Sequence, residues 1–270
     1  MMYNKARSAG ASLRSMEALA GGHSPVHRLH PAAKLFVTVL YIGLTVSFPK
    51  YSLSALAVMA LYPVVLFQLS GLRMGECFYK MRYLLPLLLA VGIANPFLDR
   101  APLLRLGSVT LTGGVVSMLT LMCKGVFALQ ASYLLMATTK LEALCAALRR
   151  LHVPSLLVSL LLLTYRYISV LLEQAALLSD AYALRAPEQR GVHFRAWGSF
   201  LGQLLLRSMD RASALYQAMQ LRGYTGEFPY AASAPFRLRD GLFLLGTGAL
   251  LILARCYDLP VCLGRLLVGL

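Results

Sequence analysis

Long apolar runs separated by short polar links dominate the hydrophobic pattern of this chain. A helix needs roughly 17–25 apolar residues to cross the hydrocarbon core of a bilayer. Five runs reach or approach that length: residues 32–48, 51–71, 83–98, 113–139 and 241–257. The third run is short and is interrupted by Pro86. The pattern therefore predicts an all-α polytopic membrane protein with about five transmembrane helices.

A sixth apolar run, residues 155–172, is harder to assign because Arg166 falls in its middle. A guanidinium at the centre of a membrane helix costs about 2.5–3.5 kcal/mol on insertion scales. The run also becomes mixed in polarity after residue 172. The pattern allows a sixth span, but it favours a helix that is half immersed in the membrane and continues into water.

Between residues 140 and 240 the pattern changes to amphipathic helices. Residues 141–151 place leucines on one helical stripe, and Pro154 ends that helix. A longer helix, expected from about residue 197 to 222, has an apolar side and an adjoining row of basic and small residues: Arg207, Arg211, Ala218 and Arg222. We expect these helices outside the membrane core. A basic helix lying flat on the lipid surface is the alternative.

The resulting layout has four parts. They are an amino-terminal arm (1–31), a four-helix transmembrane region (32–139), a cytoplasmic helical region (140–240), and a final transmembrane helix with an external tail (241–270). The arm has positive charge but no apolar segment behind it, so it is not a cleavable signal peptide.

Composition supports the membrane interpretation. Hydrophobic residues make up 58% of the 270 residues, charged residues only 14%, and the mean hydropathy is +0.66. Soluble domains carry about a quarter charged residues, so too few are present here to coat a water-facing surface. The net charge of +15 lies mostly in the arm and in 140–240. Lys and Arg are retained on the cytoplasmic side, which predicts a cytoplasmic amino terminus and an external carboxyl terminus, with no nucleic acid partner.

Motifs for independent chemistry are missing from the sequence. It contains no G-x-x-x-x-G-K-[ST], H-E-x-x-H or G-x-S-x-G pattern, so we expect no ATP hydrolysis, no catalytic residues and no cofactor. Three histidines at 23, 27 and 30 are interrupted by prolines and lack nearby carboxylates or thiols, which favours capping over metal binding. The five cysteines are scattered without C-x-x-C spacing, as expected of reduced packing residues.

Lys124 lies near the middle of the fourth apolar run. An ammonium at that depth requires a polar partner. We expect it to face the helix bundle and to meet a carbonyl or hydroxyl group, such as Ser132 or a group on a neighbouring helix. A residue on a substrate path is the alternative.

A small basic motif, Ala-x-x-x-Arg-Gly, occurs twice in the polar region. The first copy comprises Ala186, Arg190 and Gly191, and the second comprises Ala218, Arg222 and Gly223. Residues four apart lie on one helical face, and glycine suits the left-handed position that ends a helix. Each copy therefore predicts a helix end with a small residue that permits close approach and a projecting guanidinium. Five donors in a fixed fork favour a protein partner over diffuse lipid contact.

Four stretches make the chain similar to the T component of energy-coupling-factor transporters, specifically the cobalt-type CbiQ family. These are "SPVHRLHPAAKL" (24–35), "ANPF" (94–97), "LLLLTYRYI" (160–168) and the two Ala-x-x-x-Arg-Gly copies, the second extended to "RGYTGEFPY". The chain departs from the family in the first stretch, where His30 and Ala32 replace the usual Asp and Arg.

The resemblance implies a non-catalytic, multi-pass scaffold in the cell membrane of a prokaryote. Its partners would be two ABC-type ATPase subunits, one for each Ala-x-x-x-Arg-Gly copy, and a separate membrane protein that captures the substrate. Arg207 and Arg211 would support the second copy. Cobalt is the substrate that the resemblance favours, with nickel or a vitamin as alternatives. A stand-alone secondary transporter would need paired intramembrane carboxylates, and the five predicted spans have no interior Asp or Glu.

The two copies are predicted to be unequal. Pro187 lies inside the first copy, where it removes a backbone donor and is expected to kink or restart the helix. Arg222 instead ends a long amphipathic helix and is expected to be held in place before a partner arrives. We therefore expect Arg222 to matter more than Arg190.

Overall fold

The computed structural model describes residues 15–98, 102–106, 109–187, 192–224, 226 and 236–256. Residues 15–20 are helical. The elements that follow, in chain order, are α2 (Pro31–Val46), α3 (Leu53–Met59), α4 (Leu61–Ser70), α5 (Met74–Met81), α6 (Leu85–Leu98), β1 (Pro102–Leu106), β2 (Val109–Thr112), α7 (Gly113–Thr138), α8 (Leu141–Arg150), α9 (Ser155–Arg185), a 3-10 turn η1 (Phe194–Ala196), α10 (Trp197–Leu221) and α11 (Leu238–Cys256).

Contacts divide the chain into two units. One unit combines Met1–Ala20 with Lys140–Ser233, and the other combines Gly21–Thr139 with Ala234–Leu270. The chain therefore passes between the units three times: after Ala20, after α7 and before α11. We call them the α8–α10 unit and the α7 unit.

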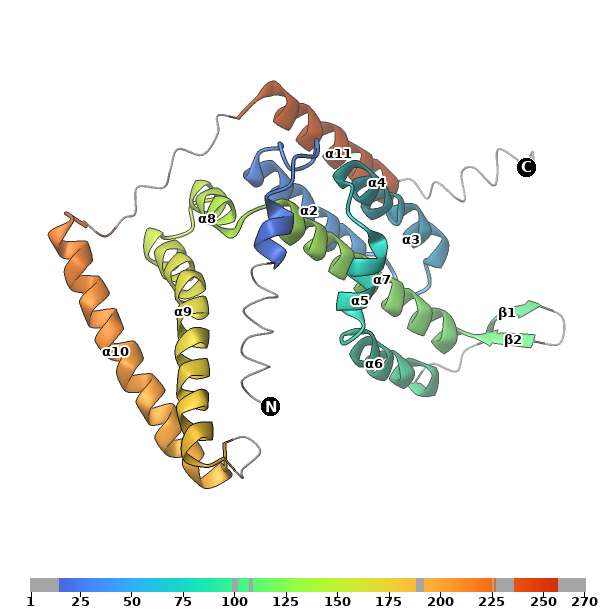
Figure 1. Cartoon of the computed structure of the whole chain (residues 1–270). Helices are drawn as coiled ribbons and strands as arrows, with labels where there is room; N and C mark the ends of the chain where they lie inside the picture. The colour runs from blue at the N-terminus through green and yellow to red at the C-terminus, as the bar shows by residue number, and fades with distance from the viewer. Residues whose placement is uncertain are drawn as a thin grey trace. The chain divides into compact units, whose positions relative to one another are not determined.

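Helix α7 is the centre of the α7 unit. It contacts α2, α3, α4, α5 and α6, while α11 packs on α2 and α3 (Figure 1). The core between these helices contains the stacked rings of Tyr41 and Tyr62, with centroids 4.4 Å apart. The Tyr41 hydroxyl donates to the carbonyl oxygen of Met59 at 3.0 Å, which satisfies a buried polar group inside this core.

The all-α class is confirmed, and the structure adds one small sheet. Strands β1 and β2 pair antiparallel as a hairpin, in a segment for which the sequence predicted only a polar link. Every predicted apolar run lies largely in helix. Within the described residues, however, Gly113–Thr138 and Ser155–Arg185 are the two helices that are long and apolar enough to cross a membrane alone. The pair α5 and α6, bent by 67°, adds a third if it acts as one span.

The second predicted run is helical but irregular: it is divided into α3 and α4 at Ala60, which keeps right-handed helical dihedral angles. Because α4 begins at Leu61, Pro63 occupies its third position. The first N–H groups of a helix have no partner within it, so the N–H that proline lacks is not needed there. The fourth run and the 155–172 run behave differently, because α7 has 26 residues and α9 continues unbroken through Arg166 for 31 residues.

The α8–α10 unit is built around two long helices. Helices α9 and α10 run antiparallel and are joined at one end through η1 (Figure 1). The Arg207 guanidinium of α10 donates to the side-chain oxygen of Gln174 on α9 at 3.2 Å. Many leucines on these helices are exposed, among them Leu156, Leu160, Leu205 and Leu206. Such faces require cover by lipid or by another protein.

Candidate functional site

The second Ala-x-x-x-Arg-Gly copy forms the end of α10. The helix stops at Leu221, and Gly223 follows with φ of +77°, a left-handed conformation. The N–H of Tyr224 donates to the carbonyl oxygen of Met219, and the N–H of Gly223 donates to that of Gln220, each at 3.0 Å. These two bonds define a Schellman motif, which closes the helix and satisfies its last carbonyls. The prediction of a helix-terminating glycine at this copy is confirmed.

Arg222 is the last residue before the left-handed turn. Its own N–H donates to the carbonyl oxygen of Met219 at 3.1 Å, so its backbone is fixed on both sides. The residue is exposed, whereas Ala218, one turn earlier, is half-buried. The result is a rigid backbone that carries a long charged side chain into solvent.

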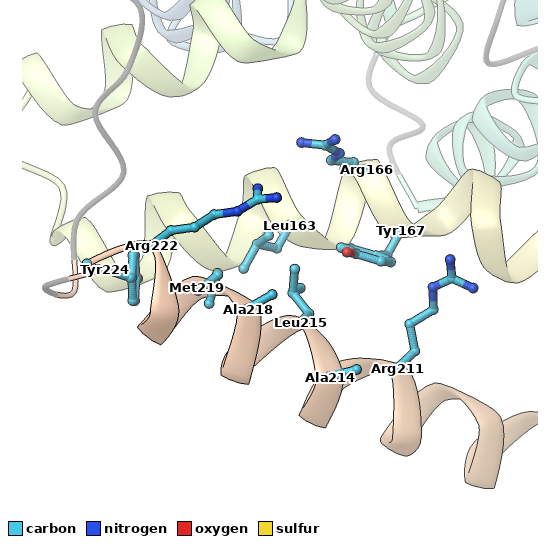
Figure 2. Close-up of a pocket in the computed structure, with 11 residues that line it drawn as sticks. Leu163, Arg166, Tyr167, Arg211, Ala214, Leu215, Ala218, Met219, Arg222 and Tyr224 are labelled. Atoms are coloured by element: carbon cyan, nitrogen blue, oxygen red, sulfur yellow. The ribbon is translucent and has the colours of Figure 1, made fainter.

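A groove of about 620 Å³ lies between α9 and α10 beside this helix end (Figure 2). Leu163 and Tyr167 of α9 point toward Leu215 and Ala218 of α10 and form its apolar part. Its lining also includes the guanidinium-bearing residues Arg166, Arg211 and Arg222, and among the described residues it has no carboxylate. Three positive charges around an apolar floor favour an acidic, partly apolar ligand.

The predicted supporting residues have separate places. Arg211 lines the groove with Arg222, while Arg207 lies farther from the helix end and bonds to Gln174 of α9. A smaller hollow between α9 and α10 includes Arg207, Arg211 and the carboxylate of Asp210. The sequence analysis missed Arg166 as a groove residue. Its signal was present, because an arginine in the middle of an apolar run requires a polar environment.

The first Ala-x-x-x-Arg-Gly copy does not form a helix end like that of the second copy. Helix α9 ends at Arg185, and Ala186 follows with φ of −135° and ψ of 67°, outside the helix. The expectation that Ala186 lies on a helical face was wrong. Pro187 gives the reason, since proline pushes the preceding residue out of the helical region. The helix ends there and is not kinked, and the next element begins at Phe194. Arg190 and Gly191 lie outside the described residues.

A buried polar cluster joins three helix ends in the α7 unit. The carboxylate of Asp240 accepts from the backbone N–H of His30 at 2.8 Å and from that of Arg237 at 2.9 Å. The ammonium of Lys34 donates to the carbonyl oxygen of Thr138 at 2.7 Å. His30, Lys34 and Asp240 are each at most 5% exposed. No sequence motif indicated this cluster.

His30 also caps α2. Its Nδ1 accepts from the backbone N–H of Ala32 at 3.1 Å, and Pro31 occupies the first helical position. The expected capping role is confirmed for this histidine. His27 makes a local contact instead, with its Nδ1 2.6 Å from the hydroxyl of Ser24.

Lys124 meets the carbonyl end of a neighbouring helix, as expected. Its ammonium donates to the carbonyl oxygens of Val46, at 3.1 Å, and Phe48 at the end of α2. Arg255 of α11 donates to the carbonyl oxygen of Ser47 at 3.3 Å and lies over the Phe48 ring. Two cations at the negative end of a helix are electrostatically favourable. The hydroxyl of Ser132 is not the partner that the structure shows.

The cysteines of the described part of the chain are free thiols: Cys77, Cys123, Cys145 and Cys256. Cys145, on α8, is buried, whereas Cys256 is exposed. Burial raises the pKa of the Cys145 thiol, and the nearby charge of Glu142 raises it further. This thiol is therefore a packing residue that resists ionisation.

Comparison with known proteins identifies a matching family and several relatives. The model of the CbiQ family, described as cobalt transport protein, matches residues 22–230. The chain is 33% identical over 107 residues to the nickel permease LarQ of Lactiplantibacillus plantarum, covering 40% of this chain and 39% of LarQ. It is 33% identical over 102 residues to the cobalt transport protein CbiQ of Rhodobacter capsulatus, covering 37% of this chain and 42% of that protein.

A longer match links the chain to the energy-coupling factor transporter transmembrane protein EcfT of Streptococcus equi subsp. equi. It has 26% identity over 225 residues and covers 76% of this chain and 81% of EcfT. The matches to LarQ and CbiQ span only about two fifths of those relatives. The family match spans most of the chain, including α2 to α10, and agrees with the apolar helices of the structure. This chain therefore belongs to the CbiQ family, as a membrane protein built mainly of helices.

Proposed function

We propose that this chain is the membrane coupling subunit of an ATP-driven metal importer, and that the end of α10 binds an ABC-type ATPase subunit. The observation that carries the proposal is the preformed end of α10, where a Schellman motif holds Arg222 beside a groove. Family membership and the likeness to EcfT support it. The chain itself has no phosphate-binding loop, so a partner must hydrolyse the ATP.

The chemistry of the α10 end defines what the partner must offer. Ala218 leaves room for close approach, and Arg222 presents a charged fork at the rim of the groove. Carboxylates or free carbonyl oxygens in a partner cleft would pair with that fork. Arg211 and Arg166 lie on the same groove and extend the positive field toward α9. Because the helix end is already ordered, binding costs less conformational entropy than it would for a loose segment.

The first copy completes the proposal. Ala186, Arg190 and Gly191 would meet a second ATPase subunit, giving one contact for each of two subunits. Helix α9 ends before this copy, so its contact would be less rigid than that of α10. We therefore propose that Arg222 contributes more to ATPase binding than Arg190.

Substrate and orientation follow from the relatives and the charge pattern. Cobalt is the favoured substrate, since the family is described as cobalt transport protein, and nickel is the alternative because LarQ is a nickel permease. A separate capture subunit in the membrane would select the metal. The Lys and Arg residues in the arm and in 140–240 support a cytoplasmic side for both segments and an external carboxyl terminus.

The decisive experiment removes the Arg222 side chain. Arg222→Ala should weaken the binding free energy between the ATPase and the chain by about 2–5 kcal/mol, the usual cost of deleting one partner of a buried charged contact. Less ATPase should therefore copurify with the detergent-solubilised chain. Membrane insertion should be unaffected, because Arg222 is exposed in the free chain. Arg190→Ala should have a smaller effect. Arg195→Ala is the matched control, since Arg195 is another exposed arginine of the same unit.

Two results would contradict the proposal. If Arg222→Ala and Arg190→Ala both retain the ATPase and support normal metal uptake, the two motif copies are not the coupling contacts. If the chain hydrolyses ATP in a preparation free of partners, it is not a non-catalytic scaffold.

A further inference from the structure

The chain passes between the two units at three points, and two of them are bound to the first turn of α2. One of these two connections follows Thr138, the last residue of α7, and the other precedes α11. Lys34 of α2 holds the carbonyl oxygen of Thr138, and Asp240 of α11 holds the N–H of His30, the capping residue of α2. One helix end therefore secures these two connections.

Asp240 closes the N-termini of two helices with a single carboxylate. Its Oδ2 accepts from the N–H of Arg237, whose carbonyl receives the first backbone bonds of α11. Its Oδ1 accepts from the N–H of His30, immediately before α2. The N-terminus of a helix carries partial positive charge, so a carboxylate is the correct charge at both ends. The contact spans 210 positions in the sequence.

Lys34 supplies the opposite charge at the opposite kind of helix end. Its ammonium donates to Thr138 at the C-terminus of α7, where the partial charge is negative. Lys34 is only 5% exposed and Asp240 only 4%, and Asp240 acts electrostatically on Lys34. Removing either charge alone would leave the other in a buried site with backbone partners only.

We infer that Lys34 and Asp240 are positioning residues for coupling: they fix two of the three connections between the units to α2, so that displacement of the α8–α10 helices is transmitted into the α7 unit. This inference rests on the proposed function. Neither residue touches substrate or nucleotide in this role. Their effect passes through the backbone at Thr138 and at the start of α11.

The test uses the complete complex, with the ATPase and capture subunits, in membrane vesicles supplied with Co²⁺. Two quantities are measured for each variant: the amount of assembled complex, and the Co²⁺ taken up per ATP hydrolysed. Asp240→Asn and Lys34→Met should assemble with the ATPase and hydrolyse ATP. Their uptake per ATP should fall at least about fivefold, the lower range of typical coupling between sites.

Three further variants make the result specific. Lys34→Arg keeps a long cationic donor toward Thr138 and should restore most of the ratio. The double variant Lys34→Met with Asp240→Asn leaves no isolated buried charge, so it provides an assembled sample even if a single variant does not fold. Its uptake of Co²⁺ per ATP hydrolysed should fall no further than that of the more strongly affected single variant. Glu76→Gln is the matched control, because Glu76 is an exposed carboxylate of the same unit.

Two outcomes would overturn the inference. One is a normal ratio of uptake to ATP in the single or double variants. The other is a fall in complex abundance that accounts for all the lost uptake, which would make the cluster purely structural. Arg222→Ala, run in parallel, separates the two proposals. If it releases the ATPase while Asp240→Asn keeps the normal ratio, only this inference fails; if it retains the ATPase, the proposed function fails.

Discussion

The left-handed turn at Gly223 is the most direct point at which to perturb the end of α10. Gly223 has φ of +77°, and a Cβ built on it meets no atom within 4 Å. Gly223→Ala would therefore cause no clash, and its cost would come from backbone conformation alone. The Schellman bonds from Gly223 and Tyr224 depend on that conformation.

The expected magnitude follows from these two facts. A residue with a Cβ pays about 1–2 kcal/mol in the left-handed region. Alanine recovers about 0.4–1 kcal/mol because it restricts the unfolded chain more than glycine does. The net loss for the closed helix end is about 1 kcal/mol, which is about fivefold in an equilibrium constant. If binding requires the closed end, the dissociation constant for the ATPase should rise by about that factor.

The assay is titration of the ATPase subunit against the detergent-solubilised chain. Gly202→Ala is the matched control: it makes the same chemical change inside α10, also with no atom within 4 Å of the new Cβ. Alanine stabilises a helix interior by about 0.5–1 kcal/mol relative to glycine. The affinity of Gly202→Ala for the ATPase should therefore be unchanged or slightly higher. Gly223→Asn should lose less than Gly223→Ala, because asparagine tolerates the left-handed region. Equal affinity for Gly223→Ala and the unmodified chain would refute the requirement for a preformed end.

Two other predictions concern the α7 unit and the cysteines. Lys124→Met should lower the free energy of unfolding of the solubilised chain by about 1–3 kcal/mol, because the carbonyl oxygens of Val46 and Phe48 lose their donor. Unchanged stability with abolished metal uptake would instead make Lys124 a substrate-path residue. In intact cells, a membrane-impermeant maleimide should label exposed Cys256 from outside. After solubilisation in mild detergent, where both sides are accessible, peptide mapping should find Cys145 unmodified at neutral pH, since its thiol is buried and its pKa is raised. Labelling of Cys256 only after cell lysis would reverse the predicted orientation.

Features that depend on short sequence spacing were predictable. The Arg-Gly pair predicted the end of α10, because only a few residues adopt the left-handed conformation that a helix end requires. The length of α7 followed from its unbroken apolar run. A carbonyl partner for Lys124 followed from the cost of leaving an ammonium unpaired at that depth.

Features that depend on distant residues or on backbone accommodation were not predictable from pattern alone. The division at Ala60 is invisible to hydropathy, because both flanking segments are apolar and only Pro63 marks the change. The groove position of Arg166 depends on which face of α9 meets α10. The bond between His30 and Asp240 joins the start of α2 to the start of α11, and no local motif relates those two segments.

The cluster at α2 also gives a physical reason why the departure at position 30 is tolerated. An aspartate before Pro31 would cap α2 with its own carboxylate and would bring a negative charge near Lys34. Here the two tasks belong to different residues. His30 caps the helix through Nδ1, which needs no charge, and Asp240 brings the carboxylate from α11. Because the charge now comes from another helix, the first turn of α2 holds α11 as well as α7. The first turn of α2 is thereby bonded both to the end of α7 and to the start of α11, next to two of the segments that lead to the α8–α10 unit.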